Sequence, residues 1–179
     1  MQRIMRLVAL CAVFALAASG ASAQIGGAVS AGNDLPARPK SFVGDFANAI
    51  DARAERQLET KLAALRKRAA IEFVVVTIET TGGEEIFDYS LNAARRWRLA
   101  KGAGDKGGIL LMLAIRDRKW RVQLTDSLRV DLPEEVLKIH GDRMSAPFGR
   151  GGVGAGVNVF VDGIIAHLAE RRWFTTGVK

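Results

Sequence analysis

The stretch that decides the fold is AGDKGGILLMLAIRDRKWRVQL, residues 103–124. Residues 109–115 form an unbroken apolar run, which is typical of a strand buried on both faces of a parallel sheet. Residues 116–119 then predict a short hairpin turn. After the turn, apolar residues alternate with polar ones, so the following strand is antiparallel and has one face in water. The apolar positions of this strand are Trp120, Val122 and Leu124.

Upstream residues supply a parallel neighbour for the central strand. The β-branched run EFVVVTIE, residues 72–79, predicts a second strand that is buried on both faces. Residues 84–97 between the two strands have helical character. A strand, a helix and a strand in succession imply a right-handed crossover between parallel neighbours. The predicted inward side of this helix consists of Phe87, Leu91 and Ala94.

Three further helices follow from apolar residues at helical spacing. Residues 51–69 predict an amphipathic helix with Asp51 as its cap, and its stripe is Ala54, Leu58, Leu62, Leu65 and Ala69. Pro133 begins another helix, whose inward face is Val136, Ile139 and Met144. The final helix buries Val157, Phe160, Val161, Ile164, Ile165 and Leu168. The predicted fold class is α/β, a layered sandwich in which a small mixed β-sheet carries α-helices on both faces.

The beginning of the chain is typical of an exported protein. Two arginines, a short apolar stretch and the motif Ala-Ser-Ala at 21–23 predict a signal peptide. The apolar stretch is shorter than the roughly 20 residues of a membrane span, and we expect no transmembrane segment in the mature chain. The expected location is therefore periplasmic or secreted. The predicted organisation is a signal peptide over 1–23, a flexible leader over 24–40, a domain over 41–170 and a short tail over 171–179.

Charge and cysteine content narrow the possible partners. Cys11 is the single cysteine and lies in the predicted signal, so the mature chain has no thiolate. Removing the signal lowers the net charge from +7 to +5, because residues 1–23 hold two of the 26 basic residues and none of the 19 acidic ones. Export argues against a nucleic-acid partner. The basic excess leaves two interpretations open, weak contact with an anionic surface or solubility alone.

Sequence motifs give little support to cofactor or nucleophilic chemistry. GRGGVG, residues 149–154, fits the dinucleotide pattern, but no strand precedes it, so we expect no nucleotide cofactor. KGAGDKGG, residues 101–108, leads into a strand and not a helix, which favours close backbone approach over phosphate binding. His140 and His167 are unpaired in sequence, and the mature chain lacks soft ligands for zinc.

Aspartates beside the predicted strands are the remaining candidates. Asp45 and Asp117 are expected at one edge of the sheet, where the parallel strands end, and their oxygens suit a hard cation such as calcium. Asp105 precedes the central strand and is separated from Asp117 by about 23 Å of strand. The structural interpretation is that each aspartate bonds its own turn, with Arg116 and Arg118 as ion-pair partners of Asp117.

The order of these elements and their amino-acid sequences resemble a TPM domain over residues 41–168. The resemblance rests on FVGDFANAID, on IEFVVVTIETTGGEEIFDYSLNAARRWRL, on DKGGILLMLAIRDRKWRVQL and on APFGRGGVGAGVNVFVDGI. It implies an α/β sandwich and an acidic cluster that binds calcium in some members. The matching acids are Asp45, Asp105 and Asp117. The chain departs from the family pattern at TDSLRVDLPEE, residues 125–135, and it lacks the carboxyl-terminal span of many bacterial relatives, which implies a free periplasmic form.

The resemblance leaves two functional hypotheses, because some family members are described as acid phosphatases and others as assembly factors for membrane complexes. The first hypothesis is a non-catalytic module that binds a divalent cation, Ca²⁺ in particular, and an envelope protein complex or membrane surface. The alternative is a metal-assisted phosphatase acting on phosphomonoesters, in which Asp117 or Asp45 serves as nucleophile or metal-borne base and nearby arginines hold the phosphate.

Overall fold

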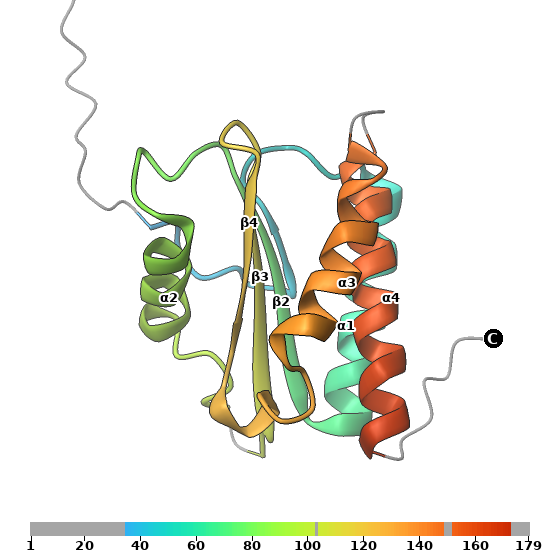
Figure 1. Cartoon of the computed structure of the whole chain (residues 1–179). Coiled ribbons are helices and arrows are strands. Elements are labelled where there is room, and N and C mark those ends of the chain that lie inside the picture. The colour runs from blue at the N-terminus through green and yellow to red at the C-terminus, as the bar shows by residue number, and fades with distance from the viewer. Residues whose placement is uncertain (1–34, 103, 149–151, 173–179) are drawn as a thin grey trace, which may run out of the picture. The chain divides into compact units, whose positions relative to one another are not determined.

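The computed structural model describes residues 35–102, 104–148 and 152–172 (Figure 1). The described residues form four strands and four α-helices, with a 3-10 turn, η1, before the third helix. The elements are β1 (Val43–Asp45), α1 (Ala52–Ala69), β2 (Ile71–Ile78), α2 (Ile86–Arg96), β3 (Gly107–Ala114), β4 (Lys119–Leu124), η1 (Asp126–Leu128), α3 (Glu134–Ser145) and α4 (Val153–Arg172).

The strands form one mixed sheet in the order β1-β2-β3-β4. β1 and β2 are parallel, β2 and β3 are parallel, and β4 is antiparallel to β3. All eight residues of β2 and all eight of β3 are buried, as their uninterrupted apolar runs predict. The short strand β1 was not predicted from the sequence. Glu59 of α1 holds it in place by accepting from the Val43 amide at 2.8 Å.

Helices cover both faces of the sheet, with α1, α3 and α4 on one face and α2 on the other (Figure 1). Alternate residues of β2 serve the two sides: Phe73 and Val75 belong to the core under α1, α3 and α4, whereas Val74 and Val76 belong to the core under α2. This alternation follows from the period of two along a strand. The predicted α/β sandwich is therefore confirmed.

Helix α1 begins and packs as the sequence predicts. The Asp51 carboxylate accepts from the amides of Arg53 and Ala54 at 3.0 and 2.9 Å, which satisfies two amides of the first turn. The helix ends where Ala70 adopts a left-handed conformation with φ 55°. Its four fully buried side chains all belong to the predicted stripe, and they are Ala54, Leu58, Leu62 and Leu65.

Helix α2 presents a different face from the predicted one. Tyr89, Ser90 and Ala93 are its buried residues, whereas Phe87 is 44% exposed. Position 87 instead lies beneath the Arg121 guanidinium, whose central carbon is 5.0 Å from the Phe87 ring centroid. The face predicted through Phe87, Leu91 and Ala94 is therefore wrong at Phe87, although Ala94 does pack against the core under α2. Trp97, two turns beyond Tyr89, extends the buried stripe and draws that side of the helix toward the sheet.

The inward face of α3 also differs in part from the prediction. Met144 is buried as predicted, but Ile139 is 52% exposed, and the other buried positions are Leu137 and Gly141. The Trp120 ring of β4 explains sterically why α3 turns a different face toward the sheet from the predicted one. A Cβ atom on Gly141 would lie 2.1 Å from the Trp120 ring, so the tryptophan packs against bare helix backbone at this position.

All six apolar residues predicted for the inside of α4 are buried. Over residues 153–171 this helix is also long and apolar enough to cross a membrane, by length and composition alone. The prediction that nothing after the signal approaches a span is wrong on that criterion. However, half of this segment is buried within the domain, as expected for a core helix.

The domain begins earlier than residue 41. Leu35 packs against the core under α2, the Trp97 indole N–H donates to the Pro36 carbonyl at 3.1 Å, and the Arg38 guanidinium pairs with Glu72. The end of the predicted leader, residues 35–40, thus lies on the folded domain. The predicted signal peptide, residues 24–34 of the leader and most of the predicted tail lie outside the described residues.

Candidate functional site

Asp45 ends β1 and fixes the loop that leads into α1. Its two carboxylate oxygens accept from the amides of Ala49 and Ile50 at 3.0 and 2.9 Å. The Thr77 hydroxyl of β2 donates to the same carboxylate. Asp45 therefore joins two neighbouring strands to the start of the first helix, and both of its oxygens already accept hydrogen bonds.

Asp117 lies in the hairpin between β3 and β4 and holds the loop that follows β2. It accepts from the Thr80 hydroxyl at 2.8 Å, from the Thr81 amide at 2.8 Å and from the Thr81 hydroxyl at 3.2 Å. The Thr81 amide and then the Thr80 hydroxyl lower the pKa of Asp117 below its ordinary value, with a smaller contribution from Lys119. The carboxylate is therefore ionised at neutral pH. Within the described residues, neither Arg116 nor Arg118 forms an ion pair with it.

The structure places Asp45 and Asp117 at the same edge of the sheet, as predicted. Asp45 is in register with Thr77 near the end of β2, and Asp117 contacts Thr80 and Thr81 just beyond that end. We call this edge, where β1, β2 and β3 end, the carboxyl edge. Within the described residues the two carboxylates have separate hydrogen-bond partners, and no group of three or more acidic, histidine or cysteine side chains is placed to share an ion.

Asp105 lies at the opposite edge of the sheet, before β3 begins. It accepts from the Gly102 amide at 3.0 Å and from the Arg66 guanidinium at 3.3 Å. The length of β3, about 23 Å between its ends, separates Asp105 from Asp117. The three candidate aspartates therefore divide into a pair at the carboxyl edge and a single residue with a different set of partners.

A pocket of about 610 Å³ opens at the carboxyl edge, between the β3–β4 hairpin and the end of α3. Trp120 and Phe148 supply aromatic surface, and Arg118 and Lys119 supply positive charge. Arg118 has a left-handed conformation with φ 53°, which is uncommon for a residue with a side chain. The remaining lining residues are mostly apolar, and they are Leu113, Ala114, Ile115, Ser145 and Val153.

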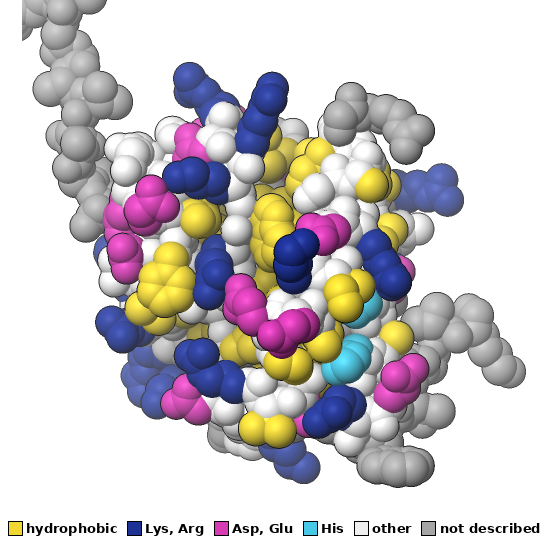
Figure 2. Space-filling model, viewed as in Figure 1, with side chains coloured by type: hydrophobic (Ala, Val, Ile, Leu, Met, Phe, Trp, Pro, Cys, Tyr) yellow, Lys and Arg dark blue, Asp and Glu magenta, His cyan; other side chains and the backbone are white. Residues whose placement is uncertain are grey.

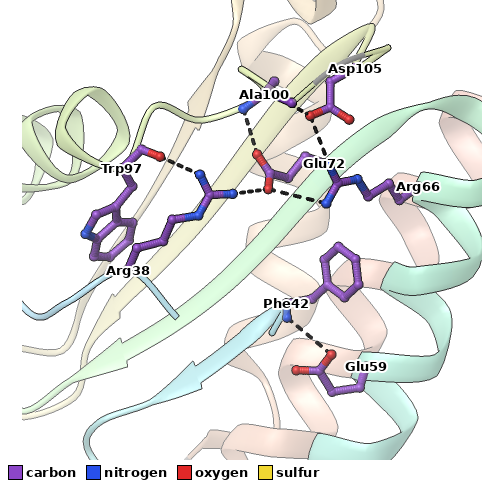
Figure 3. A network of polar contacts seen from close by, with 9 residues as sticks. Arg38, Phe42, Glu59, Arg66, Glu72, Trp97, Ala100 and Asp105 are labelled. Carbon is purple, nitrogen blue, oxygen red and sulfur yellow. Dashed lines mark hydrogen bonds and ion pairs between the residues drawn. The ribbon is translucent and has the colours of Figure 1, made fainter. Parts of the chain in front are cut away.

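Sequence reasoning missed Glu72, the most deeply buried carboxylate of the described chain. Its side chain is 3% exposed and accepts from the Ala100 amide at 2.6 Å, while Arg38 and Arg66 approach it from two sides (Figure 3). The sequence did indicate an unusual acid here, because Glu72 lies at the start of the mostly apolar run EFVVVTIE. An acid at such a position requires cationic partners, because an unpaired buried carboxylate is costly.

In the described residues, glycines in and beside the two glycine-rich motifs allow neighbouring segments to pack closely against the backbone. A Cβ atom on Gly154 would lie 2.7 Å from Ala54, and one on Gly156 would lie 2.2 Å from the Met144 carbonyl. At the start of β3, Gly107 and Gly108 are similarly close to Leu128 and Leu99. The close backbone approach predicted for residues 101–108 is confirmed at these two positions. Residues 149–151 of GRGGVG lie outside the described residues.

A comparison with models of protein families shows to which family this fold belongs. The model of the TPM domain matches residues 43–167, from the first residue of β1 to within a few residues of the end of α4. The chain belongs to the TPM domain family. The resemblance seen in the sequence is thereby confirmed, and the carboxyl edge with its two aspartates belongs to the TPM domain itself.

Solved structures agree with this assignment. The N-terminal domain of a P. gingivalis protein is 28% identical, with a TM-score of 0.67, and the match covers 74% of this chain and 85% of that one. The N-terminal domain of Corynebacterium glutamicum cg2496 is 9% identical, with a TM-score of 0.57 and 82% and 88% coverage. The BA42 protein of Bizionia argentinensis is 18% identical, with a TM-score of 0.56 and 70% and 83% coverage. No curated protein matches the chain significantly.

Proposed function

We propose that this TPM domain is a non-catalytic binding module of the cell envelope and that its carboxyl edge binds a protein partner. The observation that carries the proposal is the pocket at that edge. It combines the Trp120 and Phe148 rings with the cationic side chains of Arg118 and Lys119. Aromatic and arginine side chains around a concave apolar surface are typical of the centres of protein interfaces.

The positive charge of the pocket indicates that its partner carries negative charge. Among the described residues, Lys119 pairs with Glu85 alone, at 3.4 Å on the exposed surface, where an ion pair contributes little. Arg118 forms no ion pair with any described residue. A partner that offers an apolar side chain beside a carboxylate would fill the pocket and neutralise its rim. The fixed position of the hairpin, which Asp117 ties to Thr80 and Thr81, favours such binding because little ordering is needed.

A divalent cation at the same edge is the second part of the proposal, with Asp117 as its first ligand. The ionised state of Asp117 supports this assignment, and backbone carbonyls of the neighbouring loop and water would complete the oxygen set that calcium requires. Both carboxylates already accept hydrogen bonds, and Asp117 is preferred because it is the sequence neighbour of the pocket residue Arg118, whereas two backbone amides hold Asp45. Asp105 is at the other edge and serves as a matched control.

Calorimetric titration with calcium tests the cation part. The wild-type chain and Asp105→Asn are expected to bind calcium at millimolar concentration or below, whereas Asp117→Asn is expected not to bind. Absence of binding to the wild-type chain would remove the cation from the proposal. Hydrolysis of a generic phosphomonoester that disappears in Asp117→Asn would replace the proposal with the phosphatase alternative.

Charge reversal at the pocket rim tests the partner part. The double variant Arg118→Glu/Lys119→Glu is expected to lose capture of a defined envelope protein that the immobilised wild-type chain retains. A matched control is Arg53→Glu/Arg56→Glu, which changes the same charge on the exposed face of α1. Equal capture by all three chains would contradict a role for this pocket.

A further inference from the structure

A second, strongly basic pocket of about 290 Å³ lies at the opposite end of the domain, where α2 passes into β3. Arg95, Arg98 and Lys101 stand around it, and Leu91 and Leu99 form part of its apolar lining. All three cationic residues are exposed. Lys and Arg side chains gather over the region below α2, as the space-filling view shows (Figure 2).

The backbone that carries two of these cations is held in an uncommon conformation. Arg98 and Ala100 both have left-handed φ angles of 54°, which cost free energy in residues with side chains. The buried Glu72 carboxylate accepts from the Ala100 amide at 2.6 Å and keeps the turn in place (Figure 3). Leu99 is 9% exposed and anchors the same turn in the core under α2. Arg98 and Lys101 therefore extend from a fixed segment and not from a loose loop.

The acids nearest to this segment are engaged elsewhere. Asp105 accepts from Arg66 and from the Gly102 amide, and Glu72 is enclosed by Arg38 and Arg66. Asp126, beyond β4, pairs with Arg129 at 2.8 Å. As a result, Arg95, Arg98 and Lys101 have no ion-pair partner among the described residues. Three unneutralised cations around one apolar hollow form a surface that favours an anion from outside the domain.

We propose that this pocket binds the phosphate group of an anionic phospholipid at a membrane surface. Guanidinium groups offer the paired donors that suit phosphate oxygens. The apolar lining suits the glycerol and acyl carbons next to that phosphate, which a free phosphate ion lacks. The site is independent of the proposed partner pocket, because the two lie at opposite edges of the sheet. Binding here would leave the carboxyl edge directed away from the lipid.

Vesicle binding by the full chain tests the proposal. Co-sedimentation is measured with vesicles of phosphatidylcholine alone and with vesicles containing phosphatidylglycerol, and the first value is subtracted so that charge-independent binding is removed. The test variant is Arg95→Gln/Arg98→Gln/Lys101→Gln. The control variant is Arg53→Gln/Arg56→Gln/Lys67→Gln, which removes the same charge from one exposed face of α1. Circular dichroism verifies that both variants are folded.

The test variant is expected to bind phosphatidylglycerol vesicles at least about tenfold more weakly than wild type, because each basic residue near an anionic surface contributes on the order of 1 kcal/mol. The control variant is expected to lose less than about threefold, a bound set by that same charge effect acting at greater distance. Equal losses in both variants, or no binding by wild type, would overturn the proposal. Saturable binding of soluble glycerol phosphate at these residues without vesicle binding would also overturn it, since the ligand would then be a soluble phosphate.

Discussion

At the residue scale, the three aspartates near the strand ends stabilise the fold, and they are also the candidate site residues. Asp45 and Asp105 accept hydrogen bonds from amides of their own loops, as the structural interpretation expects, whereas Asp117 holds the separate loop that follows β2. Their surroundings differ nevertheless. Asp117 stands beside the aromatic and basic pocket, Asp45 is enclosed by the amides before α1, and Asp105 is paired with Arg66. These differences make Asp117 the aspartate most suited to a ligand.

The hydrogen bonds to Asp117 predict a dependence of stability on pH. The native pKa is lowered from 3.8, so the stabilisation from the ionised carboxylate is present above that value and is lost as the pH falls through the native pKa. Asp117→Asn should lower the free energy of unfolding by about 1 kcal/mol at pH 7, a modest loss because the group is only partly buried. Urea unfolding at pH 7 and pH 3 should show the difference shrinking. A difference of the same size at both values would contradict the assignment.

His140 predicts a second dependence at higher pH. Burial, and then the charges of Arg143 and His167, lower its native pKa below the ordinary value of 6.5. The unfolded chain therefore binds the proton first, and stability is full above 6.5 and declines as the pH falls from there toward the native pKa. Thermal unfolding of wild type should show a lower midpoint at pH 5.5 than at pH 7.5, and His140→Gln should show a smaller decrease. Equal decreases in both chains would exclude His140 as the source.

At the element scale, the packing of α3 on β4 explains where sequence patterns succeed and fail. Strands β2 and β3 were predictable because their apolar runs are nearly uninterrupted, and the helices α1 and α4 were predictable because their stripes are unambiguous. The face of α3 depends on contact with Trp120 of another element, and the face of α2 depends on Trp97, which lies just beyond the end of that helix. The buried Glu72 and both pockets were missed for the same reason, since each is assembled from residues of several elements.

Substitution of Gly141 tests the contact between α3 and β4. Alanine normally favours a helix over glycine by about 1 kcal/mol. Here its Cβ would meet the Trp120 ring, so Gly141→Ala should instead lower the free energy of unfolding by about 1–3 kcal/mol. Trp120→Ala should cost about 3–5 kcal/mol, because its ring also packs 6.2 Å from the Phe160 centroid. Chemical denaturation measures both. A stabilising Gly141→Ala would show that the predicted overlap is relieved elsewhere.

At the scale of the whole molecule, the two edges of one sheet carry different chemistry. The carboxyl edge holds the Asp45 and Asp117 loops and the aromatic pocket. The opposite edge holds the buried Glu72 network and the basic pocket. Residues 35–38 lie at this second edge, because the Arg38 guanidinium pairs with Glu72 and the Trp97 indole N–H donates to the Pro36 carbonyl. The folded unit therefore includes a segment that composition assigns to a leader.

A comparison of two start points tests that boundary. A chain beginning at Ser41 should be less stable than one beginning at Leu35 by about 3 kcal/mol, because Glu72 loses its closest cation and Trp97 loses a hydrogen bond. Arg38→Ala in the longer chain should reproduce about 2 kcal/mol of that loss, less than for a fully buried pair because Arg38 is half exposed. Equal stability of the two chains would restore the boundary at residue 41.

Site-specific photo-crosslinking in living cells tests the central claim, that the carboxyl edge is a partner-binding surface. A photoreactive amino acid replaces Lys119 at the rim of the aromatic pocket in one chain and Lys67 on the exposed face of α1 in another. We expect a discrete covalent adduct with an envelope protein at position 119 and none at position 67. No adduct at position 119, or the same adducts at both positions, would contradict it.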